Sequence, residues 1–340
     1  MAVVCTFAAG IGHVATGPVL AFITAALALS LLAMVVGEAT DQMGSRLSPG
    51  ATGVLQSALG NLPELFVCIF SLRAGLNEVV KSALIGSILA NSVLVLGLAI
   101  LVGGLKNGHQ KFSSEPPRMM AVLMLLATAA LLVPTLAHEA HTAASVHESS
   151  LSSFCAFVLL AVFVCSLTFF LKGSKEVAPE AHDPGAATWA MPFAIGVLAS
   201  AGMGAAFVSE WFVAALEPAM KALGLSEAFA GLVVVAIAGN AIENLVGIQL
   251  AARNKMDYAI SVILNSSLQI ALVLIPVLVL LSLWIAPVAL TLTLSPLLAC
   301  ALVLSSIVSA FVVFDGESIW LEGVALIGLY VIIAAAFWWG

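Results

Sequence analysis

The sequence predicts an all-α polytopic membrane protein, built from two inverted-topology repeats of five transmembrane helices plus a short N-terminal helix. Three observations lead to this fold class, and the first is composition. Of the 340 residues, 62% are hydrophobic and only 9% are charged, and the mean hydropathy is +1.17. Soluble globular proteins carry about 25% charged residues because water must solvate their surface. The other two observations are the lengths of the apolar runs and a motif that occurs twice.

Composition and charge exclude several classes of protein. A soluble enzyme is excluded by the low charge content, and the net charge of −7 with 11 Lys and Arg argues against a nucleic-acid partner. The five cysteines lie in apolar runs without a Cys-x-x-Cys pair, so no disulfide framework is expected. The expected partner is the lipid bilayer, and the absence of targeting features favours a prokaryotic inner (plasma) membrane. Formation of a homo-oligomer is left open by the sequence.

The apolar runs have the length of membrane-spanning helices, which need about 20 residues each. Residues 1–16 are expected to form the short N-terminal helix, and residues 209–228 an amphipathic partial helix at an interface. The predicted spans are 19–37, 51–73, 79–103, 118–137, 150–171, 188–208, 229–252, 258–281, 289–312 and 318–338.

Lys and Arg indicate the orientation of these spans. The loops after the first, third, fifth and seventh spans hold eight of the 11 basic residues, and cytoplasmic loops are rich in Lys and Arg. These loops are therefore assigned to the cytoplasm. One of them, the polar segment 172–187, divides the chain into a first repeat, 19–171, and a second repeat, 188–340.

An internal repeat supports this division. The motif Gly-Asn-x-x-Glu occurs at 60–64 and again 179 residues later at 239–243. Each half has five spans. Because this number is odd, the two copies of the repeat enter the membrane from opposite sides. In secondary transporters, such an inverted repeat places the substrate site near the middle of the membrane, where the two halves meet.

The residues of the motif have the chemistry of a cation site. A carboxylate in the middle of a membrane helix costs about 2.5–3.5 kcal/mol, so Glu64 and Glu243 are expected to be functional. Glycine before each pair, and Pro63 in the first copy, weaken the helix and free carbonyls for coordination. The remaining candidate ligands have amide or hydroxyl oxygens and lie in the motifs or in the spans that follow: Asn61, Asn240, Ser87, Asn91, Ser266 and Gln269.

Two carboxylates with several neutral oxygens suit a hard cation such as Ca²⁺, which takes six to eight oxygen ligands. Burial and like charge both favour the protonated form of such acids, so H⁺ competes with the metal. A site that binds either Ca²⁺ or H⁺ is the core of an antiporter. Both ions are substrates, and no cofactor is expected.

At these residues the chain resembles the Ca²⁺/cation antiporter superfamily, and within it the cation/proton exchanger branch. The resemblance rests on both Gly-Asn-x-x-Glu motifs, on the run from Gly86-Ser87 through Asn91 to Gly97, and on Ser266-Ser267-Leu268-Gln269. It extends from about residue 19 to the C-terminus. It implies Ca²⁺/H⁺ exchange by alternating access, with Glu64 and Glu243 as the central cation ligands and Asn61, Asn240, Ser87, Ser266 and Gln269 around them.

Two departures from the branch's pattern leave alternatives open. Asn244 follows the second motif where the branch has His, and Asn265 precedes Ser266 where the branch has Gly. A Na⁺-coupled or monovalent cation/H⁺ exchanger on the same scaffold is therefore the first alternative. An intramembrane enzyme is a distant one, because the sequence offers neither a nucleophile–base pair nor a zinc-ligand set.

Other acidic and imidazole side chains near the span ends have simpler explanations. Glu38 and Glu210 lie at the ends of predicted spans and are candidate gate residues, although solvation at the interface also explains them. His138-Glu139-x-His141 differs from the His-Glu-x-x-His pattern of zinc proteases. A solvated loop is therefore favoured over a metal site there.

Overall fold

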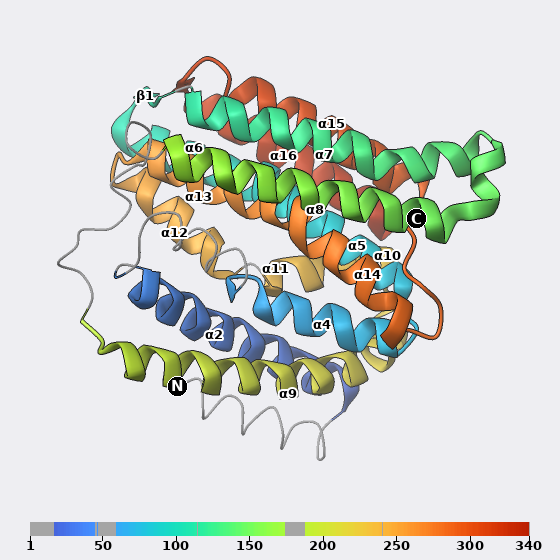
Figure 1. Cartoon of the computed structure of the whole chain (residues 1–340). Coiled ribbons are helices and arrows are strands. Elements are labelled where there is room, and N and C mark those ends of the chain that lie inside the picture. Colours follow the sequence, from blue (N-terminus) through green and yellow to red (C-terminus); the bar gives the residue numbers. More distant parts are fainter. Residues whose placement is uncertain are drawn as a thin grey trace. The chain divides into compact units, whose positions relative to one another are not determined.

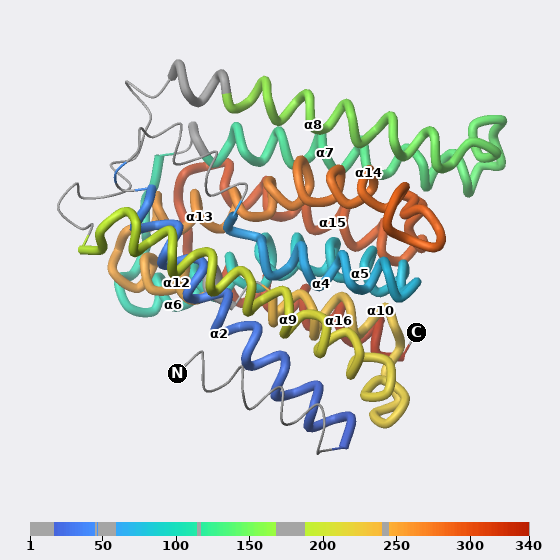
Figure 2. The backbone as a smooth tube through the Cα atoms, turned by 60° about the horizontal axis from the view of Figure 1, so that its bottom comes forward, coloured from blue at the N-terminus to red at the C-terminus, as the bar shows by residue number. Residues whose placement is uncertain are grey.

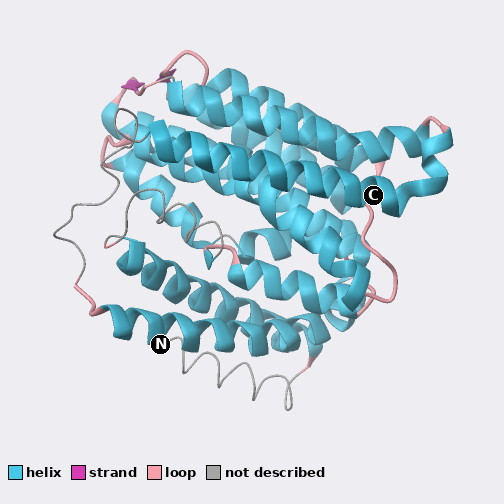
Figure 3. Cartoon of the chain, in the orientation of Figure 1, coloured by secondary structure: helices cyan, strands magenta, loops and turns pink. Residues whose placement is uncertain are grey.

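The computed structural model describes residues 17–44, 46, 59–113, 115–173, 188–239 and 241–339. Helices account for most of the described residues, and the strands among them are two short ones (Figure 3). The predicted N-terminal helix, residues 1–16, and most of the predicted linker 172–187 lie outside the described residues. The chain forms two compact units, and each of them takes segments from both halves of the sequence.

Unit 1 comprises residues 1–76, 162–225 and 238–242, and unit 2 comprises residues 77–161, 226–237 and 243–340. The helices of unit 1 are α2 (Pro18–Gly44), α4 (Leu62–Arg73) and α9 (Met191–Leu223). Four further elements are divided by, or adjoin, the boundaries between the units: α8 (Glu148–Gly173), α10 (Glu227–Phe229), α11 (Ala236–Gly239) and α12 (Ala241–Ala252).

The other elements belong to unit 2. They are α5 (Asn77–Leu89), η1 (Ala90–Val95), α6 (Leu96–Asn107), β1 (Gln110–Lys111), α7 (Glu115–Glu139), η2 (Ala143–His147), η3 (Ala230–Val235), α13 (Met256–Gln269), η4 (Ile270–Leu274), α14 (Ile275–Ile285), α15 (Pro296–Val312), β2 (Glu317–Ser318) and α16 (Trp320–Trp338). η1, η3 and η4 are π-helical turns within longer helices, and η2 is a 3₁₀ helix.

In unit 1, α2 and α9 pack side by side and antiparallel (Figure 1). Near one end of the pair the rings of Phe22 and Phe212 stack with their centroids 4.8 Å apart. At the other end the Gln42 side-chain oxygen accepts hydrogen bonds from the backbone amides of Thr188 (3.0 Å) and Trp189 (3.2 Å). These contacts fix the C-terminal end of α2 against the N-terminal end of α9.

The sequence prediction for residues 188–228 is wrong in its division into two parts. One helix, α9, runs without interruption from Met191 to Leu223. Its buried face continues through Phe212, Leu216 and Met220 at helical spacing, so the same packing face extends beyond the predicted end at residue 208. The helix ends at Gly224, whose left-handed conformation (φ 67°) is one that glycine adopts without strain.

Unit 2 contains several helix pairs whose backbones come into contact. A side-chain carbon at Gly86 of α5 would overlap the backbone of Leu232 in η3. One at Gly97 of α6 would lie 2.9 Å from the carbonyl oxygen of Gly323 in α16. Glycine lets membrane helices approach this closely, so that van der Waals contacts hold them together.

At one end of unit 2, strands β1 and β2 pair antiparallel, with Gln110 opposite Ser318 and Lys111 opposite Glu317. The buried Gln110 amide donates to the Ala251 carbonyl at the end of α12 (3.1 Å). The loops after the third, seventh and ninth predicted spans therefore meet at the same end. For the loops after the third and seventh spans, this agrees with the prediction that they share one side of the membrane.

At the other end of unit 2, α7 and α8 form a hairpin through η2 (Figure 2), and His138 of α7 pairs with Glu148 of α8. His141 and His147 are exposed. Among the described residues, no group of three or more His, Cys, Asp or Glu side chains could hold a metal ion. The exposure of His141 and His147 agrees with the interpretation of this region as solvated.

The predicted helix 289–312 begins later than expected, at Pro296, with Ser295 as its N-cap. The chain bends at residues 286–288 and then runs without helical turns to residue 295, and in this segment buried Leu290, Leu292 and Leu294 alternate with threonines. This alternation has the period of a strand. Proline suits the first turn of the helix that follows, because the backbone N–H that it lacks would have no partner within the helix at that position. The sequence prediction treated the whole run as helical because it weighed hydropathy alone.

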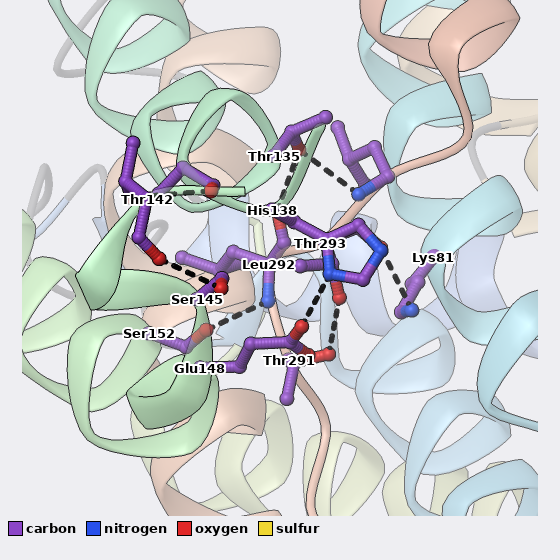
Figure 4. Close-up of polar contacts among 12 residues, drawn as sticks. Lys81, Thr135, His138, Thr142, Ser145, Glu148, Ser152, Thr291, Leu292 and Thr293 are labelled. Carbon is purple, nitrogen blue, oxygen red and sulfur yellow. Dashed lines mark hydrogen bonds and ion pairs between the residues drawn. The ribbon is translucent and has the colours of Figure 1, made fainter. Parts of the chain in front are cut away.

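Polar side chains from the surrounding helices satisfy the backbone of this extended segment (Figure 4). The Thr135 hydroxyl donates to the Leu292 carbonyl (3.0 Å) and accepts from the Leu294 amide (2.9 Å). The Ser152 hydroxyl accepts from the Leu292 amide (2.9 Å), and Lys81 donates to the Thr293 carbonyl (2.8 Å). Buried backbone groups without helical partners require such donors and acceptors.

Seven helical stretches among the described residues are long and apolar enough to cross a membrane. They coincide with the predicted spans 19–37, 79–103, 118–137, 150–171, 188–208, 258–281 and 318–338. Of the other predicted spans, 289–312 is shortened as described above and 51–73 lies partly outside the described residues. In the predicted span 229–252, α11 ends at Gly239 and α12 begins at Ala241.

Candidate cation site

The first motif lies at the beginning of a helix. Asn61 occupies the N-cap position of α4, and Pro63 stands in the first turn, where a residue without a backbone donor is tolerated. Glu64 follows in the same turn, and its side chain is only 2% exposed. The first motif therefore places a deeply buried carboxyl at the N-terminal end of α4.

The second motif meets the first one within unit 1. A side-chain carbon built on Gly239 would lie 3.6 Å from Glu64 Cβ and 3.9 Å from its carboxyl carbon. Glycine thus keeps the flank of the Glu64 carboxyl free of a neighbouring side chain. Next to it, the Ser30 hydroxyl of α2 donates to the Ala238 carbonyl (3.1 Å). The two copies of a motif 179 residues apart in sequence lie close together at this point.

The remaining residues of the second motif are only partly described. Asn240 lies outside the described residues. The backbone of Glu243 belongs to the first turn of α12, as that of Glu64 belongs to the first turn of α4, but its side chain lies outside the described part of the chain. The side chain of Asn244 is likewise outside it.

Unit 2 brings the two polar helices together. The Asn91 amide donates to the Ser266 hydroxyl at 2.9 Å, so η1 and α13 meet through two predicted ligands. Ser87 in α5 and Gln269 in α13 are also buried, with 0% and 6% exposure. A π-helical turn lies at Asn91 in one helix and directly after Gln269 in the other. Such turns occur often at functional sites.

The candidate gate residues are placed differently from the candidate ligands. The helices α2 and α9 continue beyond the predicted spans 19–37 and 188–208. Glu38 and Glu210 therefore lie within these helices rather than at their ends. Both side chains are exposed, and Glu38 accepts a hydrogen bond from Gln42 (2.9 Å). Neither belongs to the buried groups described above.

The sequence prediction missed two hydroxyls that bond to backbone carbonyls beside the candidate ligands. One is Ser30, which bonds to Ala238, and the other is Ser309 of α15, which donates to the Ser92 carbonyl (2.7 Å). Both are polar residues in otherwise apolar runs, which is the signal that could have revealed them. Their partners are more than 200 residues away along the chain, so the sequence could not have identified the contacts.

In chemical terms, the candidate residues provide carboxylate, amide and hydroxyl oxygens in a buried environment. Hard divalent cations prefer such oxygens as ligands. Each unit by itself holds buried oxygens of this kind, which are Asn61 and the acid Glu64 in unit 1, and Ser87, Asn91, Ser266 and Gln269 in unit 2.

Comparison with known proteins gives consistent results. The family model described as "Sodium/calcium exchanger protein" matches residues 17–172 and 193–339. A Ca(2+)/H(+) antiporter of Aphanothece halophytica is 35% identical over 93% of this chain and 89% of its own length. The Ca(2+)/H(+) antiporter ChaA of Bacillus subtilis is 33% identical over 90% of this chain and 88% of its own length.

Solved structures agree with the fold. The structure of native YfkE has a TM-score of 0.85 at 30% identity, and the match covers 100% of both chains. A crystal structure of the H+/Ca2+ exchanger CAX has a TM-score of 0.79 at 16% identity, over 98% of this chain and 89% of the other. The second likeness concerns the fold alone. With seven membrane-spanning candidates among its described helices, this chain is an integral membrane protein, and it belongs to the sodium/calcium exchanger protein family.

Proposed function

We propose that this chain is a secondary transporter that exchanges Ca²⁺, or a similar hard divalent cation, for H⁺. Relatives at 33–35% identity are named as Ca²⁺/H⁺ antiporters. The observation that carries the proposal is the buried carboxyl of Glu64, which lies in the first turn of α4 against Gly239 of the second motif. An acid buried in an apolar chain has a substrate to bind or a proton to carry.

In the proposed mechanism, Glu64 and Glu243 bind the cation when deprotonated and carry protons when it has left. Asn61, Asn240, Ser87, Asn91, Ser266 and Gln269 supply neutral oxygens that replace the hydration shell of the ion. Both substrates neutralise the same acids, and an empty, doubly charged site is costly in a buried environment. The cation and the protons are therefore bound in alternation. Exchange in this form needs only the transported ions and no resident cofactor.

Alternating access follows from the inverted repeat that we propose for this chain. The bounds of α4 and α12 differ by 179 residues at both ends, which is also the offset between the motifs. The antiparallel pairing of α2 and α9, each the first long helix of its half, supports opposite orientations of the two halves. Transporters with such repeats expose a fixed site to each side in turn.

The exposed acids Glu38 and Glu210 would act in this scheme as gate residues on α2 and α9, the helices that pair in unit 1. We place the protein in the inner (plasma) membrane of a prokaryotic cell, with the loops rich in Lys and Arg on the cytoplasmic side.

The test is ion flux in proteoliposomes that contain the purified protein. When Ca²⁺ is added outside the vesicles, its entry should be accompanied by the exit of protons from the vesicle interior. An imposed pH gradient should drive Ca²⁺ against its own concentration gradient. The same vesicles are then given a Na⁺ gradient without a pH gradient. Uptake driven by Na⁺ and not by H⁺ would replace the proposal with a Na⁺-coupled exchanger. Flux without counter-transport would indicate a channel.

A further inference from the structure

The first polar helix contains a π-helical turn whose backbone bonding differs from that of an α-helix. In an α-helix, the Leu96 amide would donate to the carbonyl of Ser92, four residues earlier. In η1 it donates instead to the carbonyls of Asn91 and Val93. The Ser92 carbonyl has therefore lost its α-helical donor, in a segment where Ser92 is only 2% exposed.

A side chain from another helix supplies a donor to this carbonyl. The hydroxyl of Ser309 in α15 donates to the Ser92 oxygen at 2.7 Å, and Ser309 itself is 4% exposed. Nearly one turn before it on α15, Ser306 shares a hydrogen bond of 2.9 Å with Thr128 of α7. The Ser306 contact fixes α15 and so holds Ser309 in place. Water cannot easily replace a donor that is buried this deeply.

The π-helical turn sets the direction of a candidate ligand. Asn91 lies beside Ser92 in η1 and donates to Ser266 of α13. A π-helical turn contains one residue more than an α-helical turn, so its loss rotates one side of the helix by about 100°. Such a rotation would move Asn91 away from Ser266. The residue 179 positions before Ser309 is Ala130, which has no hydroxyl to play this part in the other half.

We propose that Ser309 is a positioning residue for cation binding: its hydrogen bond to the Ser92 carbonyl holds the π-helical turn of η1, which directs Asn91 at Ser266. This inference rests on the proposed function, because Asn91 and Ser266 are its candidate ligands. Ser309 touches no ion in this scheme and acts through the backbone of η1 alone.

The matched control lies on the same helix. Ser305 is 0% exposed, and its hydroxyl has no hydrogen-bond partner among the described residues. Ser309→Ala and Ser305→Ala therefore remove the same atom from the same helix. Only the Ser309 substitution also removes a hydrogen bond to η1. Both variants and the wild type are reconstituted, and the rate of Ca²⁺-driven proton release is measured as a function of Ca²⁺ concentration.

We expect Ser309→Ala to raise the Ca²⁺ concentration for half-maximal exchange about three- to tenfold, the equivalent of one buried hydrogen bond. The maximal rate should change less than twofold. Ser305→Ala should match the wild type in both quantities. Hydrogen–deuterium exchange of the amides in 90–97 should accelerate in Ser309→Ala and remain unchanged in Ser305→Ala.

Equal half-maximal concentrations for the two variants would overturn the inference and leave the proposed function intact. So would faster amide exchange without a change in half-maximal concentration, because Ser309 would then serve stability only. A wild-type protein that exchanges neither Ca²⁺ nor another divalent cation for H⁺ contradicts the proposed function, and the inference falls with it.

Discussion

Two polar regions of unit 2 use similar side chains for different purposes. Around the extended segment 286–295, the hydroxyls of Thr135, Ser152 and Ser282 bond to backbone amides and carbonyls that have no helical partner. In the polar helices, the Asn91 amide bonds to the Ser266 hydroxyl between two helices that do not need these groups for their own bonding. The first region satisfies the backbone, and the second joins two helices through their side chains.

This difference shows how polarity can be interpreted in a chain that is 62% hydrophobic. A buried hydroxyl next to an irregular segment is explained by the amide or carbonyl that it satisfies. Buried acids and amides of membrane helices are instead candidates for binding a substrate. Substitutions should therefore divide into those that change stability and those that change exchange.

The largest effect should come from the acids of the two motifs. Glu64→Gln and Glu243→Gln each remove the charge that binds the cation while keeping the size of the side chain. We expect each to lower the exchange rate roughly 100-fold or more, about 2.7 kcal/mol, without loss of folded protein. Proton release from proteoliposomes measures the rate, and thermal unfolding measures the fold.

The control for these variants is Glu217→Gln, the same substitution at an exposed acid that pairs with Lys221 on α9. It should exchange at the wild-type rate. Uptake at the wild-type rate by both Glu64→Gln and Glu243→Gln would remove the proposed mechanism.

Next in size is the loss of an α7 hydroxyl that bonds to the extended segment. Thr135→Val leaves the Leu292 carbonyl and the Leu294 amide without their partner, which should destabilise the protein by about 2 kcal/mol. The Ca²⁺ concentration for half-maximal exchange should stay within about twofold of wild type, since none of the candidate ligands lies in the segment. Thermal unfolding in detergent and vesicle flux give the two quantities.

Thr24→Val provides the comparison, because the Thr24 hydroxyl bonds only to carbonyls of its own helix. It should leave the unfolding temperature almost unchanged. A large change in Ca²⁺ affinity in Thr135→Val would show that the two polar regions are not separate in function.

A smaller effect is expected for a neutral ligand. Asn91→Ala removes the amide that bonds to Ser266, and we expect about a five- to tenfold increase in the half-maximal Ca²⁺ concentration. Ser267→Ala is the matched variant, since that hydroxyl bonds to the Ile263 carbonyl of its own helix (3.4 Å). If the two variants have the same affinity, Asn91 joins helices and binds no cation.

The smallest effect concerns an exposed ion pair near β1 and β2. Lys111 hydrogen-bonds to Glu317 at 2.9 Å and holds the pKa of that carboxyl below its ordinary value, with a lesser contribution from His109. The pair therefore adds to stability above the ordinary pKa of glutamate, and the contribution is lost as the pH falls through the lowered pKa. Lys111→Gln should lower the unfolding temperature slightly at neutral pH.

The difference from wild type should disappear in acid, where Glu317 is protonated in both proteins. Unfolding temperatures between neutral pH and about pH 3 measure this convergence. Lys106→Gln, which removes a charge from the same end of unit 2, should give no pH-dependent difference. A difference that grows as the pH falls would contradict the assignment of the pair.

Several features follow from the sequence alone. Low charge and long apolar runs predict membrane spans because hydrocarbon excludes unpaired charges, and seven of those spans coincide with described helices. The repeated motif singles out Glu64 and Gly239, and the two residues lie close together in unit 1. Both conclusions depend on local composition and spacing, which a sequence contains in full.

Tertiary packing decided the rest. Hydropathy could not distinguish helix from extended chain at 286–295, because buried leucines occur in both and only the hydroxyls of distant helices make the extended form acceptable. Nor could it end α9 at Gly224 rather than near residue 208, because the continuing buried face depends on what packs against it. The bonds from Asn91 to Ser266 and from Ser309 to Ser92 join residues 175 and 217 positions apart. Residues so far apart in sequence meet only when the helices that carry them pack together, and that is why the sequence supplied the polar groups while the fold chose their partners.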